Sequence, residues 1–300
     1  MRILVTGANG LVGSRVCHAL AKAGHCVFAL SRGERRVRGD FDYVSCELTD
    51  ARGLRAAFDE SKPEVVVHPA SMTVVDACEK DPLAAYEANV VATQEVAREA
   101  RRLGAHLVHV STDYVFDGDH GPYSEDDRPN PRGVYATTKH MAEQAVRVLA
   151  PSWAICRTAV VYGWPQAART NFGAWMVGAL GKGEQVKLFQ DQYVSPSLAD
   201  NVAAMLAEIA TRRLDGVWNV AGADVVNRLE FGLLLCELFG FDKSKVVPVR
   251  LKEAGMASPR PLHSGLKVDK ARAHLAEKPL GLRESLERFR DAYRAAQGTS

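Results

Sequence analysis

A tyrosine and a lysine four positions apart carry the clearest chemical signal in this 300-residue sequence. Tyr135 and Lys139 fall at the start of a predicted helix, so their side chains project from one face, a turn apart. A free phenol, with a pKa of about 10, is a poor acid or base at neutral pH, but a neighbouring ammonium favours the phenolate and lowers that pKa. The pair is typical of a tyrosine that transfers protons. Because this spacing also occurs by chance, the interpretation depends on where the helix lies.

The helix that carries this pair follows a strand that ends in hydroxyl and carboxyl groups. We predict the strand over residues 107–110, and Ser111, Thr112 and Asp113 come after it. In an open parallel sheet, ligands bind beyond the carboxyl ends of the strands. The hydroxyl of Thr112 is therefore expected to face the same crevice as Tyr135.

Three regularly spaced glycines predict dinucleotide binding. Gly7, Gly10 and Gly13 lie between a predicted strand at 3–5 and a predicted helix at 11–23. In that setting the first glycine permits a tight turn, the second lets the backbone approach a pyrophosphate, and the third lets helix and strand pack closely. The helix N-terminus adds N–H groups and a positive dipole for the phosphates. Outside such a frame, three glycines indicate only a turn.

The residues after the second predicted strand, 26–30, indicate which dinucleotide binds. A carboxylate at this strand end would bond the adenosine ribose, whereas a basic residue would meet a 2′-phosphate. Here the strand is followed by Ser31 and Arg32, and then by Arg35, Arg36 and Arg38. Because a guanidinium matches a phosphate group, this pattern favours NADPH over NADH. If the arginines form only a solvated loop, both cofactors would be used about equally.

The spacing of apolar residues predicts the fold that positions these groups. Short apolar runs alternate with segments of helical period, as in consecutive βαβ units, and strands apolar on both faces imply a parallel sheet between two helical layers. We therefore predict an α/β protein with a Rossmann-type doubly wound parallel sheet and a smaller C-terminal substrate-binding lobe. The predicted strands are 3–5, 26–30, 65–67, 107–110, 153–161 and 217–220, and the predicted helices are 11–23, 54–59, 82–103, 135–149, 171–180, 198–210, 229–239 and 282–293.

The regular alternation ends after residue 162, which suggests two interleaved units. We assign residues 1–162 and 190–222 to an NAD(P)-binding Rossmann domain. Residues 163–189 and 223–300 are assigned to the substrate-binding lobe. A chain of this length accommodates two such units.

The composition is that of an ordinary globular protein, with 47% hydrophobic and 25% charged residues and a net charge of +2. This near balance gives no reason to expect a nucleic acid partner. No apolar run is long enough to span a bilayer and the first residues do not resemble a signal peptide, so we expect a cytoplasmic protein without a membrane contact. The six cysteines and nine histidines lack metal-binding spacing, so we expect no metal. A homodimer is the common default assembly.

Several segments together resemble one known family. They lie at 6–13 (TGANGLVG), 111–118 (STDYVFDG), 122–126 (PYSED), 130–139 (NPRGVYATTK), 157–163 (RTAVVYG), 191–197 (DQYVSPS) and 260–266 (RPLHSGL). With these motifs the chain resembles the extended short-chain dehydrogenases/reductases, and among them the dTDP-4-dehydrorhamnose reductases and related sugar-nucleotide reductases. The motifs are more specific for the family than for the substrate.

This resemblance implies a role for each matching residue. Tyr135 would protonate a keto oxygen as the nicotinamide delivers hydride, Lys139 would bond the nicotinamide ribose, and Thr112 would hold the oxygen. Asn89 would position a water of the proton relay, or else serve only as a helix residue bonded to nearby backbone. Cofactor contacts are implied for Gly7, Asn9, Gly10, Leu11, Val12, Gly13, Ser31, Arg32, Leu48, Pro69, Ala70, Ser71, Tyr135 and Lys139. Substrate contacts, with a structural role as an equal alternative, are implied for Asp113, Phe116, Asn171, Gln192 and Arg260.

The sequence departs from the family pattern outside the catalytic set. Ala136 replaces the usual glycine after the tyrosine, and segment 68–71 (HPAS) replaces an alanine-rich run. Lys267 replaces an aspartate, and Glu47 stands where an aspartate commonly meets the adenine. Loop 164–170 also differs. The changes at Lys267 and in this loop bear on which sugar binds, and not on the reductase chemistry.

These observations predict an NADPH-preferring ketoreductase of a nucleotide-linked 4-keto sugar. A second hypothesis is an NADP-binding regulatory subunit, because the non-catalytic subunit of methionine adenosyltransferase resembles the same reductases. A third hypothesis keeps the reductase chemistry and assigns it to another carbonyl substrate of a biosynthetic pathway.

Overall fold

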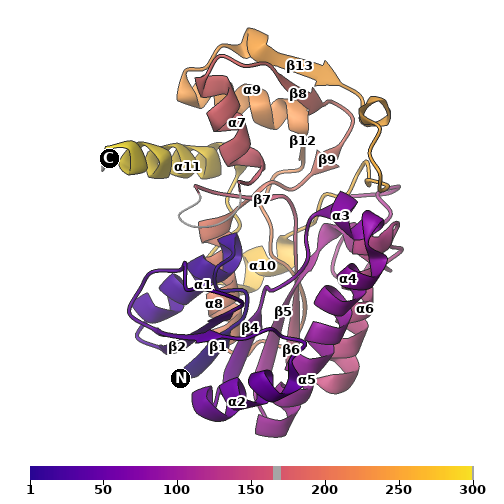
Figure 1. Ribbon diagram of the computed structural model, residues 1–300. Helices are drawn as coiled ribbons and strands as arrows, with labels where there is room; N and C mark the ends of the chain where they lie inside the picture. Colours follow the sequence, from indigo (N-terminus) through magenta and orange to yellow (C-terminus); the bar gives the residue numbers. More distant parts are fainter. Residues whose placement is uncertain (165–169, 299–300) are drawn as a thin grey trace.

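The computed structural model describes residues 1–164 and 170–298, and a seven-stranded parallel sheet forms its centre (Figure 1). The strand order is β3–β2–β1–β4–β5–β6–β11. The order reverses between β1 and β4, which makes this pair the switch point beside which ligands bind in such sheets. The strands are β1 (Arg2–Val5), β2 (Cys26–Ser31), β3 (Asp42–Ser45), β4 (Val65–His68), β5 (His106–Thr112), β6 (Trp153–Thr158) and β11 (Gly216–Asn219).

Helices cover both faces of the sheet. One layer consists of α1 (Leu11–Lys22) and α8 (Ala199–Thr211), and the other of α2 (Ala51–Ser61), α5 (Ala92–Leu103) and α6 (Val134–Leu149). Alternate residues of β1 face opposite layers, as the pleat of a strand requires. Ile3 and Val5 pack with the first layer, and Leu4 packs with the second. The predicted doubly wound α/β fold is therefore confirmed, as Figure 1 shows.

A smaller lobe lies beyond the carboxyl ends of the strands, above the sheet in Figure 1. Its core surrounds Tyr162, whose ring contacts those of Phe231 and Phe289 edge-to-face, with centroids 5.0 and 5.5 Å away. Such aromatic pairs add to the stabilisation from buried area. The lobe contains α7 (Phe172–Gly181), α9 (Arg228–Phe239), α11 (Leu282–Gln297) and the parallel pair β8 (Val186–Phe189) and β13 (Val246–Val249).

Short elements connect the sheet to the lobe. The strand β7 pairs with β10, and β9 pairs with β12. These elements are α3 (Val75–Lys80), α4 (Pro82–Tyr86), β7 (Val161–Tyr162), β9 (Tyr193–Val194), β10 (Ser197–Leu198), β12 (Val226–Asn227) and α10 (Asp269–His274).

Three elements differ from the sequence prediction. The helix predicted over 82–103 is interrupted by a π-helical turn at Glu87–Val91, which separates α4 from α5. The strand predicted over 153–161 ends at Thr158, because Val160 takes a left-handed conformation with φ 41° and redirects the chain. The edge strand β3 was not predicted, since it is only four residues long and partly exposed.

The division into two units stays a prediction. Ala271 and Leu275, which the sequence assignment places in the lobe, pack in the core on one face of the central sheet. The pairing of β9 with β12 also joins segments assigned to different units. Residues 165–169 of the divergent loop 164–170 lie outside the described residues.

The described residues contain neither a membrane-spanning helix nor a metal-binding cluster. Over 1–164 and 170–298, no helix is long and apolar enough to cross a membrane. Within the same ranges, no group of three or more histidine, cysteine, aspartate or glutamate side chains is arranged to hold a metal ion.

Candidate active site

The glycine turn has the shape that a pyrophosphate requires. Gly7 has a φ of 58°, and a Cβ on this residue would lie 2.9 Å from the Cα of Ala70. A Cβ on Gly13 would collide with the carbonyl oxygen of Gly7. Gly10 begins α1 without a side-chain cap, and the first turn holds no acidic residue, so the helix N-terminus is suited to an anion. Leu11 and Val12 form the start of the helix.

Residues at the ends of β2 and β4 flank this turn. Ser31 ends β2, and the Arg32 side chain beyond it is 80% exposed, with a guanidinium nitrogen 3.9 Å from a carboxylate oxygen of Glu47. An exposed ion pair at this distance leaves the Arg32 guanidinium available for a phosphate. Leu48 is buried in the core under α2. Beyond β4, Pro69, Ala70 and Ser71 line the far side of the turn, where Ala70 contacts Gly7.

The structure brings the predicted threonine and tyrosine into contact. The Tyr135 side chain is buried at the start of α6, where it lies close to the side chain of Thr112 at the end of β5. The Thr112 hydroxyl in turn donates to Oδ1 of Asp113 over 3.0 Å. The tyrosine therefore points toward the carboxyl edge of the sheet, next to the switch point.

Lys139 lies one turn along α6 and faces the same edge. Its Nζ donates to the carbonyl oxygen of Val110 over 2.8 Å and lies 3.4 Å from Nε2 of His109. Burial lowers the pKa of Lys139 to about 8, and the nearby carboxylate of Glu143 opposes this shift. The ammonium is thus present at neutral pH and is held by β5.

The pKa of Tyr135 is raised, whereas the sequence predicted that Lys139 would lower it. Burial raises the pKa of this phenol, and the nearby hydroxyl of Thr112 only partly offsets the effect. The expected lowering by Lys139 is absent because the ammonium is bonded to β5 instead. This phenol therefore carries its proton at neutral pH, as a proton donor must, although the raised pKa makes it a weaker acid.

The ionisation of Lys139 predicts a pH dependence. If the ammonium binds the cofactor, kcat/KM for NADPH is expected to fall with rising pH above about 8, because the charged fraction of Lys139 decreases there. A pH series of NADPH oxidation measures this profile, since kcat/KM reports groups of the free enzyme. A profile that remains level well above this pH would show that the charge of Lys139 is not required.

Asn89 connects three parts of the site. It is buried in the π-helical turn, where its Oδ1 accepts from Ser71 Oγ at 3.0 Å and from the backbone N–H of Met72 at 2.7 Å. Its Nδ2 donates to Oγ1 of Thr138 on α6 at 3.1 Å. The side chain therefore holds the β4 loop against the helix of Tyr135. A role for Asn89 in positioning a relay water stays a prediction.

Asp113 and Gln192 each form a hydrogen bond with a residue of the smaller lobe. Ser264 Oγ donates to Oδ2 of Asp113 over 2.5 Å. Burial raises the pKa of Asp113 to about 6, although the bonds from Ser264 and Thr112 act in the opposite direction. Gln192 is also buried, and its Oε1 accepts from Nε of Arg228 over 3.2 Å. Asp113 thus lies beside Thr112 and Tyr135, and Gln192 lies beside Tyr114.

The other three predicted substrate residues differ in whether they are free to contact a ligand. Arg260 bonds Asp76 over 2.8 Å, and its second terminal nitrogen, Nη1, is buried without a partner among the described residues. Asn171 caps α7 and exchanges hydrogen bonds with the backbone of Gly163. Phe116 is fully buried and stacks on Tyr123. Arg260 therefore has a free donor, whereas Asn171 and Phe116 are engaged within the fold.

Sequence reasoning missed Arg228, the first residue of α9. Its guanidinium lies over the ring of Phe172 at 4.6 Å and bonds Gln192. Burial lowers the pKa of Arg228, and the positive charge of Arg260 acts in the same direction, so the two guanidinium groups lie near each other. Two cations beside Tyr114 and Asp113 create an environment suited to an anion. Nothing in the local sequence distinguishes Arg228 from an exposed helix-start arginine.

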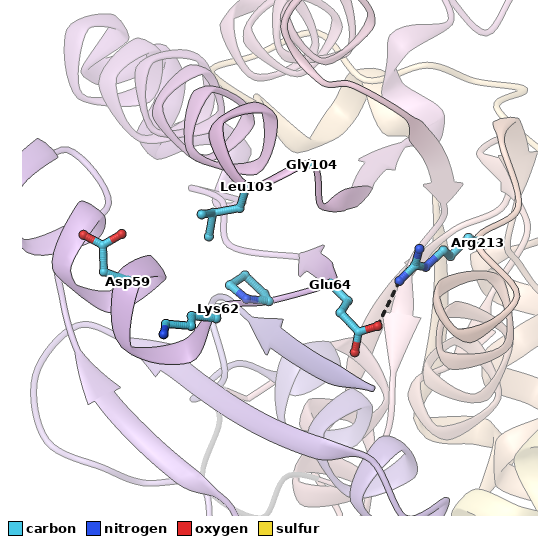
Figure 2. Close-up of a pocket in the computed structure, with 7 residues that line it drawn as sticks. Asp59, Lys62, Glu64, Leu103, Gly104 and Arg213 are labelled. Atoms are coloured by element: carbon cyan, nitrogen blue, oxygen red, sulfur yellow. Dashed lines mark hydrogen bonds and ion pairs between the residues drawn. The ribbon is translucent and has the colours of Figure 1, made fainter.

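A surface hollow lies at the opposite ends of the strands and does not belong to this site. Figure 2 shows it between Asp59, Lys62, Glu64, Leu103 and Arg213, with an ion pair of 3.2 Å joining Glu64 and Arg213. These residues precede β4 or lie at helix ends, so the hollow is at the amino ends of the strands. Ligands of doubly wound sheets bind at the carboxyl ends.

The sheet order, the glycine turn and the buried threonine, tyrosine and lysine define an extended short-chain dehydrogenase/reductase. Within this class, the chain belongs to the RmlD substrate binding domain family, whose model matches residues 1–295. The family resemblance of the motifs is thereby confirmed.

Individual relatives cover nearly the whole chain. A dTDP-4-dehydrorhamnose reductase of Mycobacterium tuberculosis is 33% identical over 271 residues, which cover 88% of this chain and 84% of that protein. Methionine adenosyltransferase 2 subunit beta of Xenopus tropicalis is 31% identical over 300 residues, 96% of this chain and 88% of that one. The crystal structure of dTDP-4-dehydrorhamnose reductase from Bacillus anthracis in complex with NADP superposes with a TM-score of 0.86 at 28% identity, covering 96% and 98% of the two chains.

Proposed function

We propose that this protein is an NADPH-preferring ketoreductase that acts on a nucleotide-linked 4-keto sugar. The observation that carries the proposal is the placement of the buried Tyr135 side chain beside Thr112 at the carboxyl edge of the sheet. The same edge holds an ammonium, that of Lys139, on the adjacent turn of α6. Similarity to dTDP-4-dehydrorhamnose reductases supports the sugar-nucleotide class.

The residues around the glycine turn fit a dinucleotide. The turn itself, with Asn9, Leu11 and Val12, would surround the pyrophosphate with its backbone. Its tight shape needs glycine, because a Cβ on Gly7 or Gly13 would collide with neighbouring backbone. The adenosine end would meet Ser31, Arg32 and Leu48, the middle would meet Pro69, Ala70 and Ser71, and the nicotinamide end would meet Tyr135 and Lys139. When bound, NADPH supplies the hydride.

The side chains of this protein then have three tasks in the reaction. Tyr135 donates its phenolic proton to the carbonyl oxygen of the sugar as the hydride arrives. Thr112 orients that oxygen through its hydroxyl group, and Lys139 holds a ribose hydroxyl with its ammonium. Asp113, Gln192 and Arg260 would position the substrate, while Asn171 and Phe116 support the walls.

The pair Arg228 and Arg260 supports a charged, nucleotide-linked substrate over a free sugar. A diphosphate carries negative charge that two guanidinium groups bind well, often through two parallel hydrogen bonds. The unpartnered Nη1 of Arg260 is a donor available for such a group. A neutral carbonyl compound would offer no negative charge to these two guanidinium groups.

The cofactor preference predicts the effect of Arg32→Ala. We expect KM for NADPH to rise by about tenfold or more, because a charged hydrogen bond to the 2′-phosphate is lost. KM for NADH should change little. Steady-state oxidation of both cofactors by the wild type and the variant measures the two values. Equal changes for NADPH and NADH would contradict a 2′-phosphate contact at Arg32.

A regulatory subunit is the second candidate function, favoured by the similarity to methionine adenosyltransferase 2 subunit beta. A screen of NADPH oxidation against a panel of nucleotide-linked keto sugars separates the candidates. We expect turnover with at least one 4-keto sugar. No turnover with any sugar, together with stable co-purification with a methionine adenosyltransferase, would favour the regulatory role. Turnover only with unrelated ketones would indicate a reductase of another carbonyl compound.

We expect this reductase to act as a cytoplasmic homodimer, since closed two-fold dimers are the commonest oligomers.

A further inference from the structure

The loop between β2 and β3 is a built structure rather than a loose basic arm. Val37, in its middle, is only 2% exposed and packs in the core under α1. The guanidinium of Arg35 closes the loop by donating to the carbonyl oxygens of Val37 at 2.9 Å and Gly39 at 2.6 Å, over the ring of Phe41. The charge of Arg35 is therefore used inside the loop.

The loop is attached to the glycine turn by one buried side chain. Asn9 is 4% exposed, and its Oδ1 accepts from the backbone N–H groups of Arg36 at 2.9 Å and Val37 at 3.1 Å. Its Nδ2 donates to the carbonyl oxygen of Glu34 at 3.0 Å and to Oη of Tyr43 at 3.1 Å. These four bonds use the hydrogen-bonding capacity of the amide, so this side chain serves the loop rather than a ligand.

We propose that Asn9 is a positioning residue for recognition of the 2′-phosphate and that Arg36 is a second phosphate-binding arginine in addition to Arg32. This inference rests on the proposed use of NADPH and names two residues that would set the preference for NADPH over NADH. The amide fixes the backbone of Arg36 next to the pyrophosphate turn, while its side chain remains exposed. A loop fixed before binding loses less conformational entropy when the phosphate arrives.

Binding of two nucleotide fragments tests the inference without any carbonyl substrate. Calorimetry on the full-length protein compares adenosine 2′,5′-bisphosphate with AMP, which lacks only the 2′-phosphate. In the Asn9→Ala variant we expect the bisphosphate to bind about tenfold more weakly, with AMP affected much less. Arg36→Ala should lower the same ratio of affinities. Arg288→Ala, an exposed arginine on α11, controls for the loss of one positive charge and should leave the ratio unchanged.

The possible results separate this inference from the proposed function. Equal weakening of both fragments by Asn9→Ala would make Asn9 a general support of the turn and would overturn the inference, as would an unchanged ratio in Arg36→Ala. If Asn9→Ala does not fold, Tyr43→Phe removes a single bond to the amide and should lower the ratio in the same direction; an unchanged ratio would again overturn the inference.

A wild-type protein that binds both fragments equally would overturn the NADPH preference as well. Keto-sugar reduction with NADH would then still stand as a separate result.

Discussion

Replacing Tyr135 by phenylalanine is expected to lower kcat for keto-sugar reduction by about 10²–10⁴-fold, the usual contribution of a positioned general acid. The ring stays in place, because its packing against Tyr114, with centroids 5.8 Å apart, does not involve the hydroxyl. NADPH binding should therefore change little. Steady-state kinetics together with a fluorescence titration of NADPH measures both quantities.

Tyr162→Phe is the matched control for this variant. Tyr162 is also fully buried, and its hydroxyl bonds Oγ of Ser285 over 2.7 Å in the lobe core, away from the catalytic edge. Its loss should cost about 1 kcal/mol of stability and leave kcat unchanged. If Tyr135→Phe turned over as fast as Tyr162→Phe, Tyr135 could not be the proton donor.

Replacing Arg157 by methionine is expected to reduce the free energy of unfolding by about 3–5 kcal/mol. Arg157 on β6 and Glu143 on α6 are both buried, and two hydrogen bonds of 3.0 and 2.9 Å join them. Burial acts to raise the pKa of Glu143, but the bonds and charge of Arg157 outweigh it and lower that pKa. The variant would leave a buried carboxylate whose remaining partners are the hydroxyl of Ser111 and, at 4.0 Å, the guanidinium of Arg147. Urea unfolding followed by circular dichroism measures the loss.

The double variant Glu143→Leu with Arg157→Met shows whether charge or packing causes this effect. Removing both charges should recover most of the lost stability, because a buried pair is often replaceable by apolar groups of similar size. Equal instability of the single and double variants would mean that contact between Arg157 and the ring of Phe116, 5.0 Å away, matters more than the ion pair. The ion pair of Glu143 and Arg157 also concerns the active site, because Glu143 lies one turn beyond Lys139 on α6.

The parts of the fold that follow local rules could be predicted from the sequence. Tyr135 and Lys139 share a helix face because their spacing is that of one turn, and Thr112 meets them because β5 ends beside that helix. The π-helical turn around Asn89 could not be predicted, since its residues have the same apolar spacing as a continuous helix. The left-handed conformation of Val160 is also set by tertiary packing, as β-branched residues disfavour it.

Residues of the site that arise from distant contacts were also beyond sequence reasoning. Arg228 reaches Gln192 across 36 positions of the chain, and only the folded lobe brings these two side chains together. His109 lies beside Lys139 because β5 and α6 pack against each other, which the separation of 30 positions along the chain does not reveal. The pKa of Tyr135 depends on burial, which the spacing of two residues does not reveal.

Isotope transfer tests the catalytic assignment most directly. The protein is mixed with NADPH that carries deuterium at the transferable position, and each nucleotide-linked 4-keto sugar of the panel is added in turn. Mass spectrometry of the sugar products should find a single deuterium at the reduced carbon for the wild type and almost none for Tyr135→Phe. A wild-type protein that binds NADPH firmly but transfers no deuterium to any of these ketones would contradict the account.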